Sequence, residues 1–566
     1  MEVTIELISH WGPAGNGQIT VKNISSTTKT NWSIPLTFDN FTPTAFYNMD
    51  FSSGNNTYTI TNKSWKPTLN VGESVVSQFA FTGTSKTLVV TTTDPSIAII
   101  NKTLPTTPTT PTTPTTPTTP TTPTNFKNKI FGYLPEWGIY QLAYTPSMIP
   151  TKKLTHIVYA FMAANPTQED YNILASNYGF PIKPYDASIP EGTVVPHDVY
   201  AHNEINLGEY GNGLMNAMKV VKQKAPHLKI IVSVGGWSLT WNLSHVFAKV
   251  ESRQRFVKSL VKYVVDRGFD GADIDDEYVG IVGAHYNIVD PVNDPANFVL
   301  MLKELREEMD RVSPQKHLEI YTAISGDPVK INKLAGIQNY VDGINLMTYD
   351  YAGTFSDGGH MTPLKAGKWD VEKTWNVEAA VEATLKLGFT QTQIGIGSAF
   401  YARGSKLHIV GELKPYGKNM GPIDSYSPAL NENSMTSWKE LKDLINKNGL
   451  TEYYDETAEA AYILKPLGND MYEWWSYDNI RSVTAKAKYM KENNLNIIIW
   501  NLSDDSRDGD RSLLDAIYNT LSDGAEPEES EESEEPVTNL TLTLTNNNNT
   551  DFVLKAGQSI KLSYTV

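Results

Sequence analysis

The sequence predicts a multidomain protein: a (β/α)8 TIM barrel with an α+β insertion, preceded by an N-terminal antiparallel β-sandwich. Three observations predict this architecture. The chain has 566 residues, more than one hydrophobic core usually serves. Two segments of biased composition divide it into parts. In the middle part, eight short apolar runs alternate with amphipathic stretches, which is the pattern of parallel strands joined by helices.

Two linkers set the predicted domain boundaries. Residues 104–124 repeat Thr-Thr-Pro and favour extended polyproline II, so at ~3.1 Å per residue they form a semi-rigid tether of roughly 65 Å. The segment GAEPEESEESEEP, 524–536, is a self-repelling acidic linker. The predicted parts are a β-sandwich at 1–95, a Thr/Pro-rich linker at 96–126, a barrel domain at 127–522 with its insertion at about 405–475, an acidic linker at 523–536 and a short β-rich tail at 537–566.

The first hundred residues are rich in Thr, Ser, Asn and β-branched residues. Runs such as GQITVKNI and SVVSQFAF lie between turn signals at short intervals, which predicts the antiparallel β-sandwich. The tail after the acidic linker is also strand-like but too short for a domain. We therefore expect it to be a fragment of a further domain.

Eight apolar runs of the middle part are the expected barrel strands. Amphipathic stretches such as RQRFVKSLVKYVVDRG lie between several of them. In a parallel barrel the chemistry collects at the C-terminal ends of the strands. The runs cover residues 129–137, 154–164, 228–237, 268–275, 318–326, 341–350, 393–404 and 495–503.

The bulk composition argues against several classes of partner and chemistry. The formal net charge is −16, but seven of these charges are Glu residues within 526–535. The mildly acidic remainder argues against nucleic acid or an anionic membrane as the main partner. The chain has no Cys, so it has neither disulfides nor thiolate chemistry. No run reaches the ~18 apolar residues of a membrane span, and no signal peptide is visible in the first twenty residues.

An acidic cluster follows the fourth apolar run, in GFDGADIDDEYVG (268–280). Side chains alternate along a strand, so Asp273, Asp275 and Glu277 point the same way, and in a barrel that direction can be the lumen. Three carboxylates so close together cannot all ionise freely. One must keep its proton at neutral pH, and a carboxylic acid that does so is a general acid.

The acidic cluster has other interpretations. A solvated surface loop is the common reading of an acidic run, but this run ends an apolar strand. A calcium loop fails because Tyr278 stands where the tight turn needs Gly. A divalent-metal carboxylate site stays open as an alternative, although no His lies nearby to complete it. We expect neither metal nor cofactor.

Several motifs, in order, resemble family 18 glycoside hydrolases, the chitinases. FDGADIDDE (269–277) resembles the DGxDxDxE signature, and SVGGWS (233–238) resembles the SxGG element of strand three. LMTYD (346–350) and FYARG (400–404) resemble the elements of strands six and seven. The resemblance covers nearly the whole middle part and is strongest to bacterial chitinases with an α+β insertion between strands seven and eight.

The resemblance implies a retaining, substrate-assisted mechanism. Glu277 matches the acid that protonates the glycosidic oxygen and later activates water. Asp275 matches the group that holds the acetamido N–H of the substrate, and Asp273 the carboxylate behind it that shares a proton with Asp275. Tyr349 matches the phenol that donates to the acetamido carbonyl. The resemblance places around them the substrate-binding residues Trp500, Met347, Asp350, Arg403, Tyr133, Phe161 and Trp237.

Some of these assignments have structural alternatives. Phe161 fits core packing, and Arg403 fits a structural ion pair. Ser233, Gly235 and Gly236 fit a scaffold role. The chain departs from the family at Asp276, where an aromatic residue is usual, and after YARG, where Ser-Lys replaces a common Trp. We expect Asp276 to face the helix layer, to need a cation or water there, and to tune stability or the pH optimum without being catalytic.

The N-terminal domain resembles family 2 carbohydrate-binding modules through SHWGPAGNGQITVKNISS, NWSIPLTF and NKSWKPTLNVGES. The resemblance implies that Trp11, Tyr47 and Trp65 form a flat aromatic row that stacks on sugar rings. We expect Trp32 in the core. Tyr47 stands where a Trp is common, and the usual Cys pair is missing, so the choice between chitin and cellulose stays open.

Together the resemblances imply a secreted chitinase, expected to be monomeric, that cleaves β-1,4-linked N-acetylglucosamine polymers. Its partners would be chitin or chito-oligosaccharides at the barrel and an insoluble polysaccharide at the N-terminal domain. The alternatives are an endo-β-N-acetylglucosaminidase, a catalytically silent chitin-binding lectin and a toxin or adhesion component. Endo- against exo-action stays open.

Overall fold

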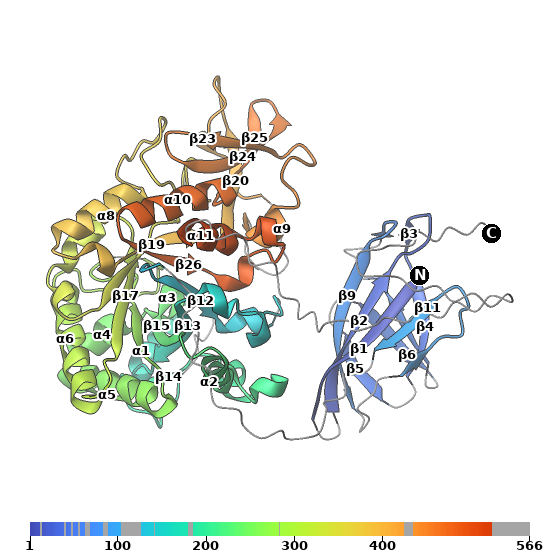
Figure 1. Ribbon diagram of the computed structural model, residues 1–566, viewed down its shortest axis with the longest axis horizontal. Coiled ribbons are helices and arrows are strands. Elements are labelled where there is room, and N and C mark those ends of the chain that lie inside the picture. The colour runs from blue at the N-terminus through green and yellow to red at the C-terminus, as the bar shows by residue number, and fades with distance from the viewer. Residues whose placement is uncertain are drawn as a thin grey trace, which may run out of the picture.

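A computed structural model describes residues 1–522, apart from 12–13, 39–40, 47–48, 55–56, 63–67, 83–88, 103–125, 141, 179–184, 282 and 424–433 (Figure 1). Two folded parts lie within this range, one on each side of the Thr/Pro-rich segment. Within the described residues, no helix combines the length and the apolar character needed to cross a membrane.

The N-terminal part consists of two main sheets packed face to face, as predicted, and a small two-stranded sheet, β3–β8. One sheet has the order β11–β1–β2–β9–β5 and the other β10–β4–β7–β6. Apolar side chains of both sheets, such as Val3, Ile34 and Phe79, form its buried core. The strands are β1 (Glu2–Trp11), β2 (Ala14–Lys22), β3 (Lys29–Thr30), β4 (Ser33–Phe38), β5 (Thr42–Phe46), β6 (Asp50–Gly54), β7 (Thr57–Thr61), β8 (Thr68–Leu69), β9 (Ser74–Thr82), β10 (Val90–Thr91) and β11 (Ala98–Lys102).

Eight parallel strands of the middle part close into a barrel, which confirms the predicted fold class. The first strand pairs with both the second and the last, so the ring has no open edge. Each strand lies inside one predicted apolar run, and β14 (Val194–Pro196) adds an antiparallel partner to the second. The ring consists of β12 (Ile130–Pro135), β13 (His156–Ala164), β15 (Lys229–Gly235), β16 (Gly271–Asp275), β17 (Glu319–Ser325), β18 (Gly343–Met347), β19 (Ile394–Ala399) and β26 (Asn496–Trp500).

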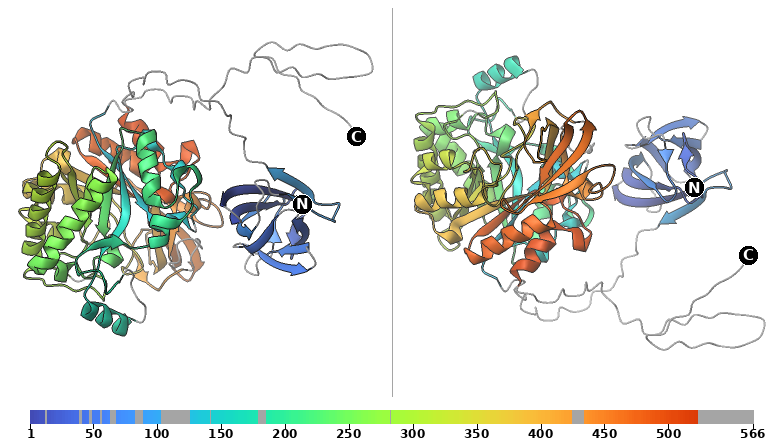
Figure 2. Two further views of the ribbon diagram at one scale, coloured as in Figure 1. Left: turned by 90° about the horizontal axis from the view of Figure 1, so that it is seen from below. Right: turned by 90° about the horizontal axis from the view of Figure 1, so that it is seen from above.

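Helices surround the barrel (Figures 1 and 2). In α5 the buried residues Phe256, Leu260 and Val264 recur every fourth position on one face, because 3.6 residues make one turn. The helix ends where Gly268 adopts a left-handed φ of 67°. The helices are α1 (Gln168–Tyr178), α2 (Leu214–Lys224), α3 (Gly236–Leu239), α4 (Leu243–Ala248), α5 (Val250–Arg267), α6 (Asp294–Val312), α7 (Pro328–Ile331), α8 (Val377–Lys386), α9 (Trp438–Leu441), α10 (Ile480–Glu492) and α11 (Leu513–Leu521).

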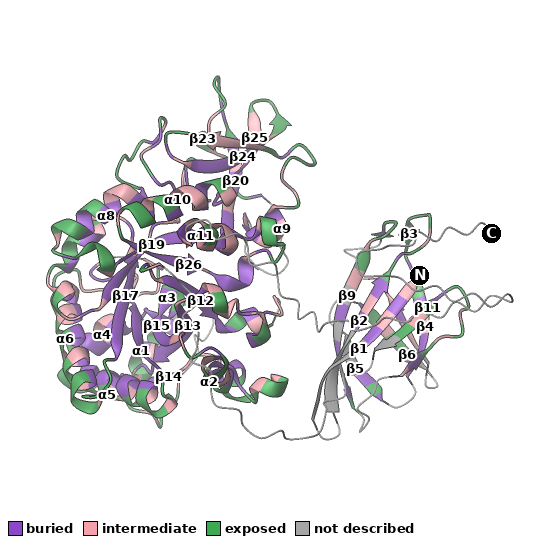
Figure 3. Cartoon of the chain, in the orientation of Figure 1, coloured by how far each residue is buried: buried purple, intermediate pink, exposed green. Residues whose placement is uncertain are grey.

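A separate sheet lies between the seventh and eighth barrel strands in the sequence. Its main path is β21–β20–β25–β24–β23, and β22 pairs with β20. Figure 1 shows this sheet at one end of the barrel domain. Figure 3 shows the barrel strands buried and the outer helix faces exposed. The strands are β20 (Tyr401–His408), β21 (Lys418–Asn419), β22 (Met435–Ser437), β23 (Thr451–Asp455), β24 (Ala460–Gly468) and β25 (Met471–Tyr477).

A buried ion pair joins the barrel to the helix that follows the extra sheet. Lys486 of α10 and Asp478 have fully buried side chains, and Nζ lies 2.7 Å from Oδ2. The same oxygen accepts from Ser398 Oγ at 3.0 Å and from the Ala399 N–H at 3.2 Å, both in β19. Lys486 also donates to Thr362 Oγ1 at 2.6 Å. Removing one partner would leave an uncompensated buried charge.

We expect Lys486→Met to lower the free energy of unfolding by about 3–5 kcal/mol, because the Asp478 carboxylate would stay buried without its cation. Chemical denaturation of the whole chain measures the change. The matched control is Lys386→Met, which removes a 2.8 Å pair with Glu382 whose side chains are 69% and 68% exposed. It should cost less than about 1 kcal/mol. Equal losses for the two variants would contradict the role given to the buried pair.

Candidate active site

The acidic cluster lies at the C-terminal end of β16, inside the ring of strands. Asp273 and Asp275 are in the strand and are buried, with 0% and 3% of their surface exposed. Glu277 follows two residues later and is partly buried. The alternation of a strand explains this spacing, since every second side chain points to the same face.

Two barrel strands donate hydrogen bonds to Asp273, and a third strand donates to one of those donors. Ser233 Oγ of β15 donates to Asp273 Oδ2 at 2.7 Å, and Tyr133 OH of β12 donates to the same oxygen at 3.2 Å. Asn345 Nδ2 of β18 donates to Tyr133 OH at 3.3 Å. Burial raises the pKa of Asp273 to about 6, against the pull of its two donors. Its Oδ1 has no hydrogen-bond partner among the described residues.

Asp275 is the most crowded carboxyl of the cluster. Burial, and then the charges of Glu277 and Asp273, raise its pKa well above the usual range. Its Oδ1, like Oδ1 of Asp273, lacks a partner among the residues described. Two adjacent buried carboxyls of this kind share a proton more readily than they both ionise.

Two glycines at the junction of β15 and α3, Gly235 and Gly236, leave room for the cluster. A Cβ on Gly235 would lie 2.2 Å from the carbonyl oxygen of Asp275, and one on Gly236 would lie 2.6 Å from the ring of Phe161. Both residues have left-handed φ values, 117° and 81°. Thr240 Oγ1 donates to the Asp275 carbonyl at 2.9 Å. These contacts support the scaffold role expected for Gly235 and Gly236.

Glu277 is placed to keep its proton. Burial raises its pKa to about 8, with help from the negative charges of Asp350 and Asp276 and against Lys330 and Arg403. A carboxyl with this pKa is protonated at pH 7 and can donate a proton to a bound substrate.

Tyr349 and Asp350 follow β18, which is separated from β16 by one strand, and they lie close enough to the cluster to interact with its charges. Burial and the charges of Asp275 and Glu277 raise the pKa of Tyr349, so the phenol stays a hydrogen-bond donor. Asp350 accepts two hydrogen bonds from Arg403, at 2.7 and 2.8 Å, and one from Tyr401 OH at 2.7 Å. Arg403 therefore forms the ion pair that was its structural alternative, on the rim of the cluster.

An aromatic cluster, made of Tyr133, Trp137, Phe161 and Trp500, lies beside the acids. Trp500, at the end of β26, stacks on Phe161 with ring centroids 5.7 Å apart and an interplanar angle of 19°. Tyr133 lies 5.7 Å from Trp500, and Trp137 lies 6.1 Å from both Phe161 and Trp500. Phe161 is 6% exposed, which fits packing, whereas Trp137 is 41% exposed.

Sequence reasoning missed Trp137. The signal that could have found it is its place at the end of the first apolar run, on the rim that carries the chemistry. Met347 packs against the same group of rings from the end of β18. Trp237 lies apart from the ring pairs of the aromatic cluster: it is 56% exposed and meets Tyr278 edge-on, with centroids 5.1 Å apart.

Asp276 lies near Asp294, at the start of α6. It is 7% exposed and accepts a hydrogen bond from the Tyr278 N–H at 3.3 Å. Burial and the nearby charge of Asp294 raise its pKa to about 7. Asp294 itself is held by Ser244 Oγ at 2.6 Å and by the Asp290 N–H at 2.7 Å. Among the described residues Asp276 has no ion-pair partner.

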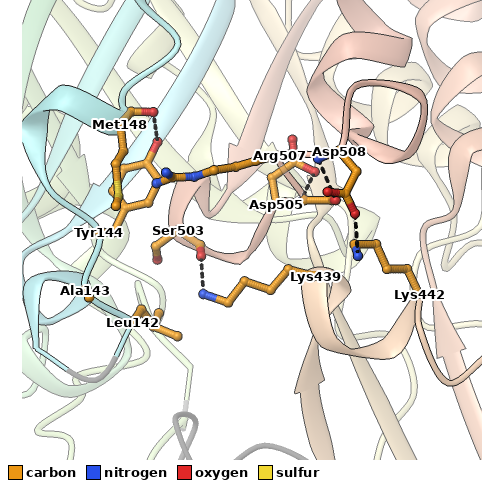
Figure 4. A pocket seen from close by; sticks show the side chains of 11 residues that line it. Leu142, Ala143, Tyr144, Met148, Lys439, Lys442, Ser503, Asp505, Arg507 and Asp508 are labelled. Carbon is orange, nitrogen blue, oxygen red and sulfur yellow. Dashed lines mark hydrogen bonds and ion pairs between the residues drawn. The ribbon is translucent and has the colours of Figure 1, made fainter. Parts of the chain in front are cut away.

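A hollow of about 290 Å³ lies between the segments that follow Trp137 and Trp500 (Figure 4). It contains none of the three carboxyls of the cluster. In the described part of the chain, no group of three or more His, Asp or Glu side chains is placed to hold a metal ion. The lining residues are Leu142, Ala143, Tyr144, Met148, Lys439, Lys442, Ser503, Asp505, Ser506, Arg507 and Asp508.

The proposed binding row of the N-terminal domain lies largely outside the described residues. Trp11 ends β1, but its side chain is not described, and Tyr47 and Trp65 lie outside the described residues altogether. Trp32 is 7% exposed in the core, as expected.

Proteins with sequences similar to this chain include two named as chitinases. Chitinase A1 of Niallia circulans is 31% identical over 412 residues, which cover 67% of this chain and 56% of that protein. A chitinase of Autographa californica nuclear polyhedrosis virus is 28% identical over 412 residues, 69% of this chain and 71% of the relative. The chain thus spans little more than half the length of the first of these proteins.

Solved structures match the barrel domain. A chitinase from Bacillus thuringiensis superposes with a TM-score of 0.61 at 26% identity, covering 70% of each chain. A family 18 N-acetylglucosaminidase from Paenibacillus barengoltzii gives a TM-score of 0.54 at 27% identity, covering 70% of this chain and all of the other.

Family models agree with these matches. The model described as cellulose binding domain matches residues 1–100, and that of glycosyl hydrolases family 18 matches residues 129–505, about two thirds of the chain. With the buried acids on β16, this places the chain in family 18 of the glycosyl hydrolases, behind an N-terminal domain of the cellulose-binding family.

Proposed function

We propose that the protein is a chitinase that hydrolyses the β-1,4 linkages of N-acetylglucosamine polymers. The observation that carries the proposal is the row of Asp273, Asp275 and Glu277 at the end of β16, where burial raises the pKa of all three acids and Glu277, with a pKa of about 8, keeps its proton at neutral pH. The family membership and the chitinases among its relatives support the same reaction.

In the proposed mechanism Glu277 donates its proton to the glycosidic oxygen as the bond to the leaving sugar breaks. The acetamido oxygen of the substrate attacks the anomeric carbon, so no nucleophile from the protein is needed. Asp275 accepts the acetamido N–H and orients that group, while Tyr349 donates to its oxygen. Glu277 then takes a proton from the water that opens the intermediate, and the configuration is retained.

Asp273 has an indirect role in this scheme. Its Oδ2 accepts from Ser233 and Tyr133, whereas its buried Oδ1 has no hydrogen-bond partner among the described residues. A proton shared with Asp275 lets Asp275 accept the substrate N–H without two full charges lying side by side. The aromatic cluster offers apolar ring faces on which sugar rings stack.

The N-terminal domain would hold the enzyme on an insoluble polysaccharide. A tethered binding domain raises the local concentration of the barrel at the surface of its substrate. A polymer of this kind is met outside the cell, so we propose an extracellular, monomeric enzyme.

We expect Glu277→Gln to lower kcat by about 10²–10⁴-fold, because the amide cannot donate the proton that the leaving oxygen needs. The assay is release of fluorophore from a chitobioside and of oligomers from colloidal chitin. The control is Glu382→Gln, whose side chain is 68% exposed on α8 and should leave the rate unchanged. If the unaltered protein binds chitin and releases nothing, the lectin alternative holds instead.

The dependence of the hydrolysis rate on pH should reflect the ionisation of Glu277 and of its neighbour Asp276. Because the pKa of Glu277 is about 8, hydrolysis should fall as the pH rises through that value and the proton is lost. Asp276, with a pKa of about 7, is negative above that pH and favours the protonated form of Glu277.

We therefore expect Asp276→Asn to move the alkaline limb of the kcat profile to lower pH and to change kcat at the optimum by less than about tenfold. Rates on the chitobioside across the pH range measure both quantities. A loss of kcat beyond about 100-fold with an unchanged melting temperature would show that Asp276 is catalytic.

The double variant Trp11→Ala, Trp65→Ala should weaken retention on insoluble chitin by roughly tenfold, about 1.4 kcal/mol, since two stacking faces are lost. Hydrolysis of the soluble chitobioside should not change. Sedimentation with chitin and, separately, with cellulose measures binding and identifies the preferred polymer. Unaltered retention on both would disprove the aromatic row.

A further inference from the structure

Glu136 is a fully buried acid outside the catalytic cluster. It directly follows β12 and begins the short 3-10 helix η1 (Glu136–Ile139), and none of its surface is exposed. Burial raises its pKa, although hydrogen bonds from His197 and Tyr159 act in the opposite direction. A buried carboxyl raises the free energy of the folded protein unless several hydrogen-bond donors compensate it.

Three donors surround the Glu136 carboxyl. His197 Nδ1 lies 2.7 Å from Oε1, and the Asp198 N–H donates to the same oxygen at 3.1 Å. Tyr159 OH of β13 donates to Oε2 at 2.9 Å. The acid therefore ties the start of η1 to the second barrel strand and to the segment at residues 197–198.

The network continues in one direction only. Tyr159 gives its single proton to Glu136, so its oxygen must accept from His202 Nδ1, 3.1 Å away. Burial lowers the pKa of His202 to about 3, so this ring is neutral and its Nε2 accepts from Tyr263 OH of α5. The chain of donors runs from Tyr263 through His202 and Tyr159 and ends on Glu136. Only an acceptor at position 136 completes it.

Trp137 is the next residue in the chain. Its half-exposed ring completes the aromatic cluster, at 6.1 Å from Phe161 and from Trp500. The hydrogen bonds of Glu136 therefore hold the backbone to which the Trp137 side chain is attached. Among the described residues no hydrogen bond or ion pair joins Glu136 to Asp273, Asp275 or Glu277, so its influence on a substrate would pass through the indole.

We infer that Glu136, with His197 and Tyr159, is a positioning site that holds Trp137 as a platform for sugar units distant from the bond that is cut. The inference rests on the proposed function, because it assigns the platform to long β-1,4-linked N-acetylglucosamine chains. Glu136 would thus set the preference for long over short substrates, and the acids on β16 would set the rate of the chemical step.

A binding cycle in the Glu277→Gln background tests this inference without turnover. Glu136→Gln keeps the shape of the side chain but turns one acceptor into a donor, which opposes the donors around it. We expect it to weaken binding of chitohexaose about tenfold and of chitobiose less than twofold, by calorimetry. In a Trp137→Ala background the same change should weaken chitohexaose less than twofold further, because the platform is already gone.

The matched control is Asp170→Asn. Asp170 is also a buried acid, 2.9 Å from a His nitrogen, but it belongs to α1 and is not next to a ring of the aromatic cluster. It should leave both affinities unchanged. If Glu136→Gln does not fold, His197→Ala removes the half-exposed partner of the same carboxyl and enters the same cycle.

Two results would overturn the inference: equal weakening for chitohexaose and chitobiose, or a tenfold effect that persists when Trp137 is Ala. Failure of the proposed function gives a different result. In that case the protein with intact Glu277 binds chitohexaose and does not hydrolyse it, while the binding cycle still reports on Glu136. Absence of any binding to chitohexaose would overturn both.

Discussion

Removing carboxyl groups from water is the constraint on which the active end of this barrel depends. Asp273 and Asp275 are buried side by side, and Glu277 lies next to them. No Lys or Arg among the described residues forms an ion pair with either carboxyl, so the free energy of the site is lowest when protons remain on it. The chemistry proposed for the enzyme uses those retained protons.

A closed ring of strands is what makes this arrangement tolerable. Tyr133, Ser233 and Asn345 are far apart in the sequence, and each comes from a different strand. Ser233 and Tyr133 donate to Asp273 Oδ2, and Asn345 donates to Tyr133 OH. These groups meet because parallel strands all end at the same rim. Gly235, the last residue of β15, then lets the backbone pass close to the Asp275 carbonyl. Packing and electrostatics thus support the same few atoms.

Much of this could be predicted from the sequence. Eight apolar runs contain the eight barrel strands, and the spacing of two along 273–277 indicated which acids share a face. Partners chosen by loop conformation could not be predicted in this way. Asp350 meets Arg403 because the segment after β18 turns through a left-handed residue, with φ of 59° at Asp350. The donors on Glu136 come from residues 23 to 62 positions away, which no local pattern reveals.

The order of the barrel strands along the chain has a consequence for the synthesis of the protein. The first strand, β12, pairs with the last, β26, and the extra sheet of residues 401–477 comes between β19 and β26. A growing chain therefore exposes two unpaired strand edges while the ribosome is still completing that sheet. Trp500 is the last residue of the final strand, so the aromatic cluster is completed in the same late event that closes the ring.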